Sequence, residues 1–227
     1  MCQAAPVAAP LELLRTAYGD LSAALYGSAA SGDPWAPTGC RGWAVHDLAF
    51  HLLGDARRAV VGLNTPARGP ADRDAVTYWR GWSPPGPGDD EALVRTRAVA
   101  AVGIAFADLV EEYAGTTAAV LVAASRVPAG ELVRTQDLAM TVDALLSTLT
   151  VEAAVHHLDL VAHLDRPGPS AGPLAEVRRV LEGLAGGPLP ATWDDATAAR
   201  RGTGRETLTG ADRAELGERA GAFPLFG

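Results

Sequence analysis

Apolar residues recur at helical spacing in four long segments of this chain. These segments are residues 11–26, a second that begins near Trp43, residues 90–124 and residues 141–164. Apolar residues three and four positions apart fall on one side of a helix, so each segment predicts an amphipathic helix with a buried face. Thr141 is of a type that caps the first turn of a helix, and Arg166-Pro167 ends the fourth segment.

The segments between these helices have the composition of loops. Residues 27–42 are rich in Gly, Ser and Pro, and residues 64–90 combine prolines with the aromatic cluster 78–82. After a shorter helix over 174–184, the chain ends in a Gly- and Arg-rich tail, and no segment alternates convincingly as a strand does. We therefore predict an all-α fold in which residues 1–168 form a four-helix bundle and residues 169–227 form a short C-terminal extension packing on it.

The fourth helix places ionisable residues on its apolar side. Its apolar stripe is formed by Val142, Leu145, Leu146 and Leu149. The next positions on this stripe are Glu152, His156 and Asp159, because spacings of three and four keep side chains on one face. A buried charge is costly unless it is paired or binds a metal ion, so the pattern predicts a metal site or an ion pair inside the bundle.

On the second helix, His51 faces the same way as Leu48 and Leu52 and can reach this site from across the bundle. Two histidines and one glutamate leave at least one coordination position open, which is typical of catalytic zinc sites. We predict that His51, Glu152 and His156 bind one divalent ion, with zinc as the first candidate. The alternatives are an ordinary i,i+4 pair on the fourth helix and a packed histidine on the second.

The remaining polar candidates have weaker claims. His46 lies about 140° around the helix from His51, His157 is similarly off the ligand face, and His163 lies roughly 10 Å beyond His156 along the axis. We assign these three histidines to surface or packing positions. Asp159 is predicted to orient a ligand histidine or to handle protons in catalysis.

Composition narrows the classes of function. The formal net charge of −8 and the scattered charges leave no basic footprint for nucleic acid or an anionic membrane. All the residues counted as Lys or Arg are arginines, which excludes Schiff-base lysine catalysis and the P-loop. The chain shows no signal-peptide pattern and no long apolar stretch, so we expect a cytoplasmic protein.

The two cysteines, Cys2 and Cys40, are too few for a disulfide framework. Cys2 lies near the chain end and Cys40 precedes the second helix, and neither falls on the inner stripe that carries the ligands. We therefore expect neither thiol to reach the open coordination position.

Arginines are the expected anchors for carboxylates of a substrate or cofactor, because guanidinium binds them bidentately. The cluster at 200–205 is the first candidate, with Arg205 as a catalytic residue and Arg201 as a cofactor-binding residue. Arg80 is a second cofactor-binding candidate, and Trp79 and Trp82 beside it are candidate pocket walls. The alternative for each arginine is a solvated surface position, and for the tryptophans ordinary packing.

Two motifs resemble the N-terminal domain family of mycothiol-dependent maleylpyruvate isomerases. Residues 43–52, WAVHDLAFHL, are similar to the family's W-x-V-x-D-L-x-x-H-L opening, and residues 152–160, EAAVHHLDL, are similar to its E-x3-H-x2-D-L helix. The likeness extends over about residues 10–168. It implies a DinB-like four-helix bundle with His51, Glu152 and His156 as metal ligands and Asp159 as a site residue.

The resemblance also implies mycothiol, a low-molecular-weight thiol, as cosubstrate. A metal-held thiolate could add to a conjugated double bond and leave again, or could remain attached, so we expect an isomerase or S-transferase acting on a small, anionic electrophile. The isomerases add a C-terminal domain with a catalytically important arginine, whereas only a short extension follows here. Alternatives are a non-haem oxygenase, a metal-water lyase or hydrolase, and a non-catalytic small-molecule binder.

Overall fold

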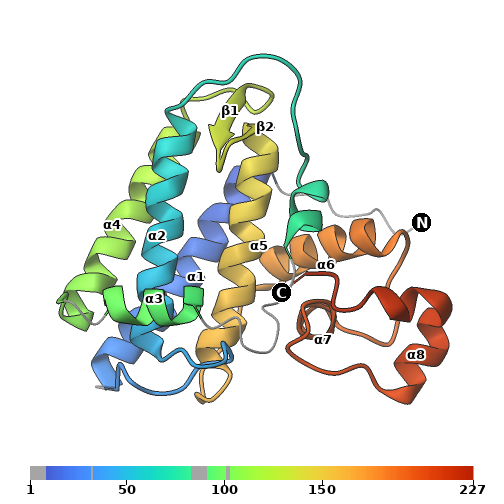
Figure 1. Ribbon diagram of the computed structural model, residues 1–227. Helices are drawn as coiled ribbons and strands as arrows, with labels where there is room; N and C mark the ends of the chain where they lie inside the picture. Colours follow the sequence, from blue (N-terminus) through green and yellow to red (C-terminus); the bar gives the residue numbers. More distant parts are fainter. Residues whose placement is uncertain (1–8, 32, 83–90, 101–102, 227) are drawn as a thin grey trace, which may run out of the picture.

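The computed structural model describes residues 9–31, 33–82, 91–100 and 103–226, and four of its helices form a bundle (Figure 1). The bundle helices are α1 (Pro10–Ser31), α2 (Val45–Leu63), α4 (Phe106–Ala124) and α5 (Val142–Val161). Helix α1 packs against α4 and α5, and α2 packs against the same two helices. The prediction of an all-α bundle is confirmed. None of the described helices is both long and apolar enough to cross a membrane.

The core of the bundle is built from the apolar stripes that the sequence predicts. Each of the four helices contributes fully buried side chains, among them Leu14, Leu21, Leu25, Leu48, Leu53, Leu109, Tyr113, Leu145 and Leu149. Burying an apolar side chain of this size contributes roughly 1.5–3 kcal/mol, so this shared core supplies most of the bundle's stability.

The third predicted helix is wrong as a single element. Residues 90–124 form two helices, α3 (Glu91–Ala100) and α4, and Gly103 between them has a φ of 128°, which is incompatible with a helix. Helix α3 packs against α2, whereas α4 runs within the bundle. The apolar spacing continues through the break, and for this reason periodicity alone did not locate it.

A β-hairpin between α4 and α5 was not predicted. Strands β1 (Leu132–Thr135) and β2 (Leu138–Thr141) pair antiparallel, with Leu132 opposite Thr141. Four residues are too few to display a clear alternation of apolar and polar positions. The hairpin leads directly into α5, and the Thr141 hydroxyl accepts a hydrogen bond from the Ala144 amide at 3.2 Å, which confirms the predicted N-cap.

Helix α5 is buried on nearly every side. One face contributes Leu145 and Leu149 to the bundle core, and the opposite face contributes Val151 and Val155 to a second core. The second core is formed with η1 (Thr77–Gly81) and the C-terminal segment, which contains α6 (Ala171–Ala185), α7 (Asp195–Gly202), α8 (Gly210–Leu216) and η2 (Gly217–Ala222). The Gly- and Arg-rich tail is therefore largely helical, and α6 packs against α5 and α1.

Asp212 joins three parts of the C-terminal segment. Its carboxylate accepts hydrogen bonds from the Trp193 indole at 2.7 Å and from Arg201 at 2.8 Å, and it completes the capping box that begins α8 at Thr209. Asp212 is buried, so if its carboxylate were removed, water would replace the lost hydrogen bonds to these partners only poorly.

We expect Asp212→Ala to lower the free energy of unfolding by about 1–3 kcal/mol, because the Trp193 indole and Arg201 lose a hydrogen-bond acceptor, although Arg201 keeps its ion pair with Glu206. Chemical denaturation followed by circular dichroism measures this loss. Asp212→Asn is the matched control and should lose less, since its amide oxygen still accepts a hydrogen bond. An Ala variant as stable as the wild type would contradict the assignment.

The same bonds predict a pH dependence. Burial alone would raise the pKa of Asp212, but hydrogen bonds from Thr209 and Trp193 and the charge of Arg201 lower it. Because the pKa is lower in the folded protein, the stabilisation is complete above the unfolded pKa, near 4, and is lost as pH falls through the folded value.

Candidate metal centre

The three predicted ligands lie together where α2 begins and α5 ends. His51 projects from the second turn of α2, and Glu152 and His156 project from α5 one turn apart. One ligand-type atom from each residue lies within 4.8 Å of the others. The His156 Nε2 atom is 3.3 Å from a Glu152 carboxylate oxygen, and the two imidazole rings meet edge to face with centroids 4.9 Å apart.

The electrostatics of this group fit a divalent cation. Burial alone would raise the pKa of Glu152, but the hydrogen bond with His156 and the charges of His156 and Arg58 lower it to about 2, so the residue is a carboxylate. Burial lowers the pKa of His51, which favours a neutral imidazole. Two nitrogen donors and one carboxylate oxygen are the ligand types of catalytic zinc sites.

Asp159 fixes the orientation of His156. Its Oδ2 atom lies 3.0 Å from the His156 Nδ1 atom, one turn farther along α5. A carboxylate that accepts the Nδ1 proton leaves Nε2, on the Glu152 side of the ring, as the nitrogen available to a metal. Burial alone would lower the pKa of His156, but its bonds to Asp159, Cys40 and Glu152 raise it, so metal binding must displace a proton.

Arg205 reaches this cluster from the C-terminal segment. Its Nε and Nη2 atoms donate to the two carboxylate oxygens of Asp159 at 2.7 and 2.8 Å, in the bidentate arrangement that planar guanidinium allows. The arginine follows α7, and its backbone amide bonds to the Arg200 carbonyl at 2.8 Å. Burial alone would raise the pKa of Asp159, but bonds to His156 and Arg205 lower it.

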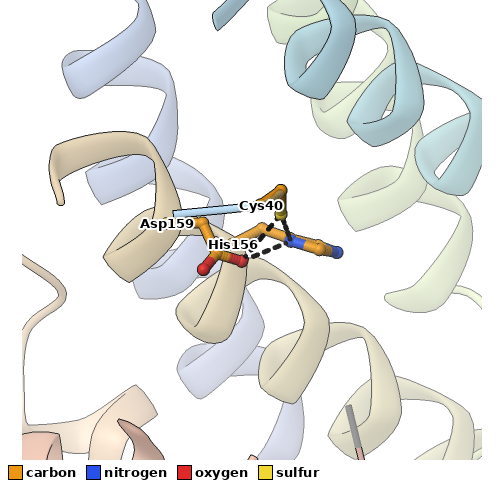
Figure 2. A group of neighbouring side chains, drawn as sticks. All are labelled: Cys40, His156 and Asp159. Atoms are coloured by element: carbon orange, nitrogen blue, oxygen red, sulfur yellow. Dashed lines mark hydrogen bonds and ion pairs between the residues drawn. The ribbon is translucent and has the colours of Figure 1, made fainter. Parts of the chain in front are cut away.

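Cys40 lies beside two residues of the cluster, which its position off the inner stripe did not indicate, whereas the prediction that its thiol does not reach the open coordination position stays a prediction. Figure 2 shows Cys40 beside His156 and Asp159: its thiol is 3.1 Å from the Asp159 Oδ2 atom and its sulfur is 3.8 Å from the His156 Nδ1 atom. These three residues form a second group with metal-ligand atoms close together. Arg205 already bonds both oxygens of that Asp159, so the His51–Glu152–His156 group is the better metal site. Cys2 lies outside the described residues.

Gly39 explains how a loop brings Cys40 there. The Gly39 amide donates to the Asp159 carbonyl at 2.8 Å, which ties the loop to α5. A Cβ atom at this position would lie 2.7 Å from the Asp159 Oδ1 atom and 3.0 Å from its Cα atom, so only glycine fits without displacement. Helical periodicity cannot reveal such a contact, because it depends on where a loop crosses a distant helix.

Asp55 and Arg58 were missed by the sequence analysis. The Asp55 Oδ2 atom lies 3.5 Å from the His51 Nε2 atom, and its Oδ1 atom accepts a 2.8 Å hydrogen bond from Arg58. Burial alone would lower the pKa of Arg58, but Asp55 raises it, so the guanidinium stays charged. A signal was present, since Asp55 lies four residues after His51 and Arg58 three residues after Asp55.

The other arginine candidates lie elsewhere. Arg201 pairs with Glu206 and Asp212 and lies over the Trp193 ring, and Arg80 is exposed on η1. Their predicted cofactor contacts stay predictions. Trp79 is buried and stacks on Phe226, so it belongs to the second core, whereas Trp82 is exposed.

The three remaining histidines have packing or surface positions, as predicted. His46 is buried and stacks on Trp35, with its Nε2 atom 3.2 Å from the Ile104 carbonyl oxygen. His157 is buried, and His163 is exposed beyond the end of α5.

The chain matches a known protein family. The model of the family described as "Mycothiol maleylpyruvate isomerase N-terminal domain" matches residues 14–161. The matched range contains the three candidate ligands, Cys40 and Asp159, and it ends before Arg205. No curated protein and no solved structure matches the chain significantly.

We expect the purified protein to carry about one divalent ion per chain, the number that one three-ligand site holds. His51→Ala and His156→Ala should each lose most of it, because each removes a ligand. Elemental analysis of dialysed protein measures this content. His163→Ala, at an exposed position, is the control and should keep the ion. Equal metal content in all three variants would refute the ligand assignment.

Gly39→Ala should push the loop away from α5 and lower the free energy of unfolding by about 1–3 kcal/mol, as overpacked sites do. In a Cys2→Ser background, the Cys40 thiol should then be more exposed. It should react with a disulfide reagent roughly several times faster than in the protein with Gly39. Gly19→Ala is the control, since a Cβ atom there meets nothing within 4 Å. Unchanged stability and unchanged thiol reactivity would show that the contact between Gly39 and α5 leaves room for a Cβ atom, and would contradict the prediction.

Proposed function

The chain belongs to the mycothiol maleylpyruvate isomerase N-terminal domain family, and we propose that it is a metal- and mycothiol-dependent isomerase or S-transferase acting on a small, anionic electrophile. One observation supports this most: His51, Glu152 and His156 converge from two helices and offer a divalent ion three ligands. Such a donor set leaves room for an external ligand.

When bound, a divalent ion at these residues supplies Lewis acidity that lowers the pKa of a thiol placed beside it. The chain's own residues prepare the site for it. Glu152 contributes the negative charge, and the two neutral imidazoles contribute none, so the centre keeps a positive charge that favours an anionic partner. Zinc is the proposed ion.

Asp159 and Arg205 support this site through His156. Asp159 accepts a hydrogen bond from the His156 Nδ1–H group, and Arg205 bonds both of its oxygens, so the carboxylate stays ionised and the imidazole ring cannot rotate freely. A ligand whose ring is held in place loses less entropy on binding a metal. We propose Asp159 and Arg205 as the pair that keeps the site in its working geometry.

Cys40 is not the proposed nucleophile, although it lies in the cluster. Its thiol donates to Asp159 and sits beside the Nδ1 atom of His156, whereas Glu152 lies beside Nε2. The proposed thiol therefore comes from solution, and Cys40 contributes a hydrogen bond to the supporting carboxylate.

The same donor set supports a second candidate. Two histidines and one carboxylate are also the ligands of non-haem iron oxygenases. Oxygen uptake by iron-loaded protein, with no requirement for a thiol, would favour that class. A small-molecule binder would retain ligand affinity with no turnover.

We expect turnover to depend on added mycothiol and to survive in a Cys2→Ser/Cys40→Ser variant. Maleylpyruvate, which the family description names, is the first electrophile to test, with fumarylpyruvate formation and loss of free thiol recorded together. Isomerisation leaves the thiol concentration constant, whereas S-transfer consumes it. Full activity in thiol-free solution, or its disappearance in the double variant, would contradict the external thiol.

Asp159→Asn should reduce kcat more than metal content, because it removes the charge that orients His156 but no metal ligand. Loss of such a supporting contact typically costs about 10–100-fold. Arg205→Gln should behave similarly, with Arg205→Lys retaining part of the activity. Arg126→Gln, at an exposed position, is the control. Parallel loss of metal and activity in Asp159→Asn would give that residue a purely structural role.

A further inference from the structure

A cleft of about 800 Å³ adjoins the candidate metal centre. Its walls come from residues 35–44, from the first turn of α2 and from one side of α3. Cys40 and Trp43 belong to both places: Cys40 contacts His156 and Asp159, and the Trp43 ring lies 5.0 Å from the His51 ring. A molecule in the cleft would therefore lie next to the metal centre.

Two aromatic walls of the cleft are held in place. Trp35 is 62% exposed, which is unusual for a tryptophan, yet it stacks on the buried His46 ring at 5.1 Å with an interplanar angle of 21°. His46 is fixed in turn by the Ile104 carbonyl oxygen. Thr38 accepts a bond from the Cys40 amide and donates one to the Trp43 carbonyl, which rigidifies the intervening turn. A rigid, exposed indole offers a flat apolar ligand a surface to stack on.

The charged lining of the cleft is mostly positive. Arg41 and Arg97 are exposed in it, and the buried Asp47 is the acidic residue among the described lining residues. The Asp47 carboxylate caps α2 through the Ala44 amide, and its Oδ2 atom also forms a long ion pair with the Arg97 Nε atom at 4.0 Å, which leaves the exposed guanidinium able to bind a further anion. Among the described residues no carboxylate is paired with Arg41.

We infer that this cleft binds the carboxylate of a small, planar organic acid, with Arg41 and Arg97 as the anion-binding residues and Trp35 as the stacking surface. Guanidinium groups bind carboxylates with paired hydrogen bonds, and indole rings stack on flat apolar groups. The further step, that this carboxylate belongs to the enzyme's substrate, rests on the proposed function. Carboxylate binding itself requires only the cleft.

The test uses benzoate, which joins a carboxylate to a flat ring, and benzamide, which has nearly the same shape without the charge. Both are titrated calorimetrically into the full-length protein, metal-loaded and metal-stripped. Benzoate should bind both forms, and benzamide at least about tenfold more weakly, the ratio that corresponds to 1.4 kcal/mol. Arg41→Gln/Arg97→Gln should weaken benzoate binding by a similar factor, and Arg41→Lys/Arg97→Lys by less.

Arg68→Gln/Arg126→Gln removes the same charge from exposed positions outside the cleft and should change the affinity by less than about twofold. Circular dichroism of each variant establishes that the fold is retained. Equal binding of benzamide, an unaffected Arg41→Gln/Arg97→Gln variant, or no benzoate binding would overturn the inference. If benzoate binds the metal-stripped protein but no electrophile is turned over with thiol, the result supports carboxylate binding in the cleft. The same result contradicts the proposed function.

Discussion

The buried ion pair between Asp159 and Arg205 is the interaction on which the arrangement of this protein depends. A carboxylate at this depth in a helical bundle is unfavourable unless charge and hydrogen bonds compensate it. Arg205 supplies both, from a segment 46 residues later in the sequence. The bundle therefore contains a buried negative charge, which Arg205 of the C-terminal segment neutralises. The same Asp159 carboxylate contacts the candidate ligand His156, so this ion pair also ties the segment to the candidate metal centre.

The two candidate ligand histidines each lie near a carboxylate that pairs with an arginine. His156 contacts Asp159, which bonds to Arg205, and His51 contacts Asp55, which bonds to Arg58. In each case the carboxylate lies one turn farther along the helix than the imidazole and forms an ion pair with an arginine. Asp159 is 3.0 Å from the His156 Nδ1 atom, whereas Asp55 is 3.5 Å from the His51 Nε2 atom. The difference is in origin: the His51 support lies within one helix, whereas the His156 support requires the tail to fold. A change in the C-terminal segment should therefore alter the orientation of His156 more than that of His51.

Helix α5 gives this arrangement its rigidity. Its two apolar faces belong to two cores, so neither face can move without disturbing packed side chains. Glu152 and His156 project from a helix that is fixed on both sides, and Gly39 lets a loop lie directly against it. The loop contributes Cys40 to the cluster and also forms a wall of the cleft, so the candidate metal centre and the cleft are both bounded by this loop.

The sequence alone determined the bundle and the candidate ligands, because both follow from local spacing: apolar residues at 3.6-residue intervals, and Glu152, His156 and Asp159 on the same stripe. Tertiary structure decided what local spacing cannot encode. Gly103 divides a periodic segment, a hairpin too short to alternate precedes α5, and the tail folds against it. Arg205 and Cys40 meet Asp159 through contacts 46 and 119 residues apart, which arise only when packing sets the path of distant loops.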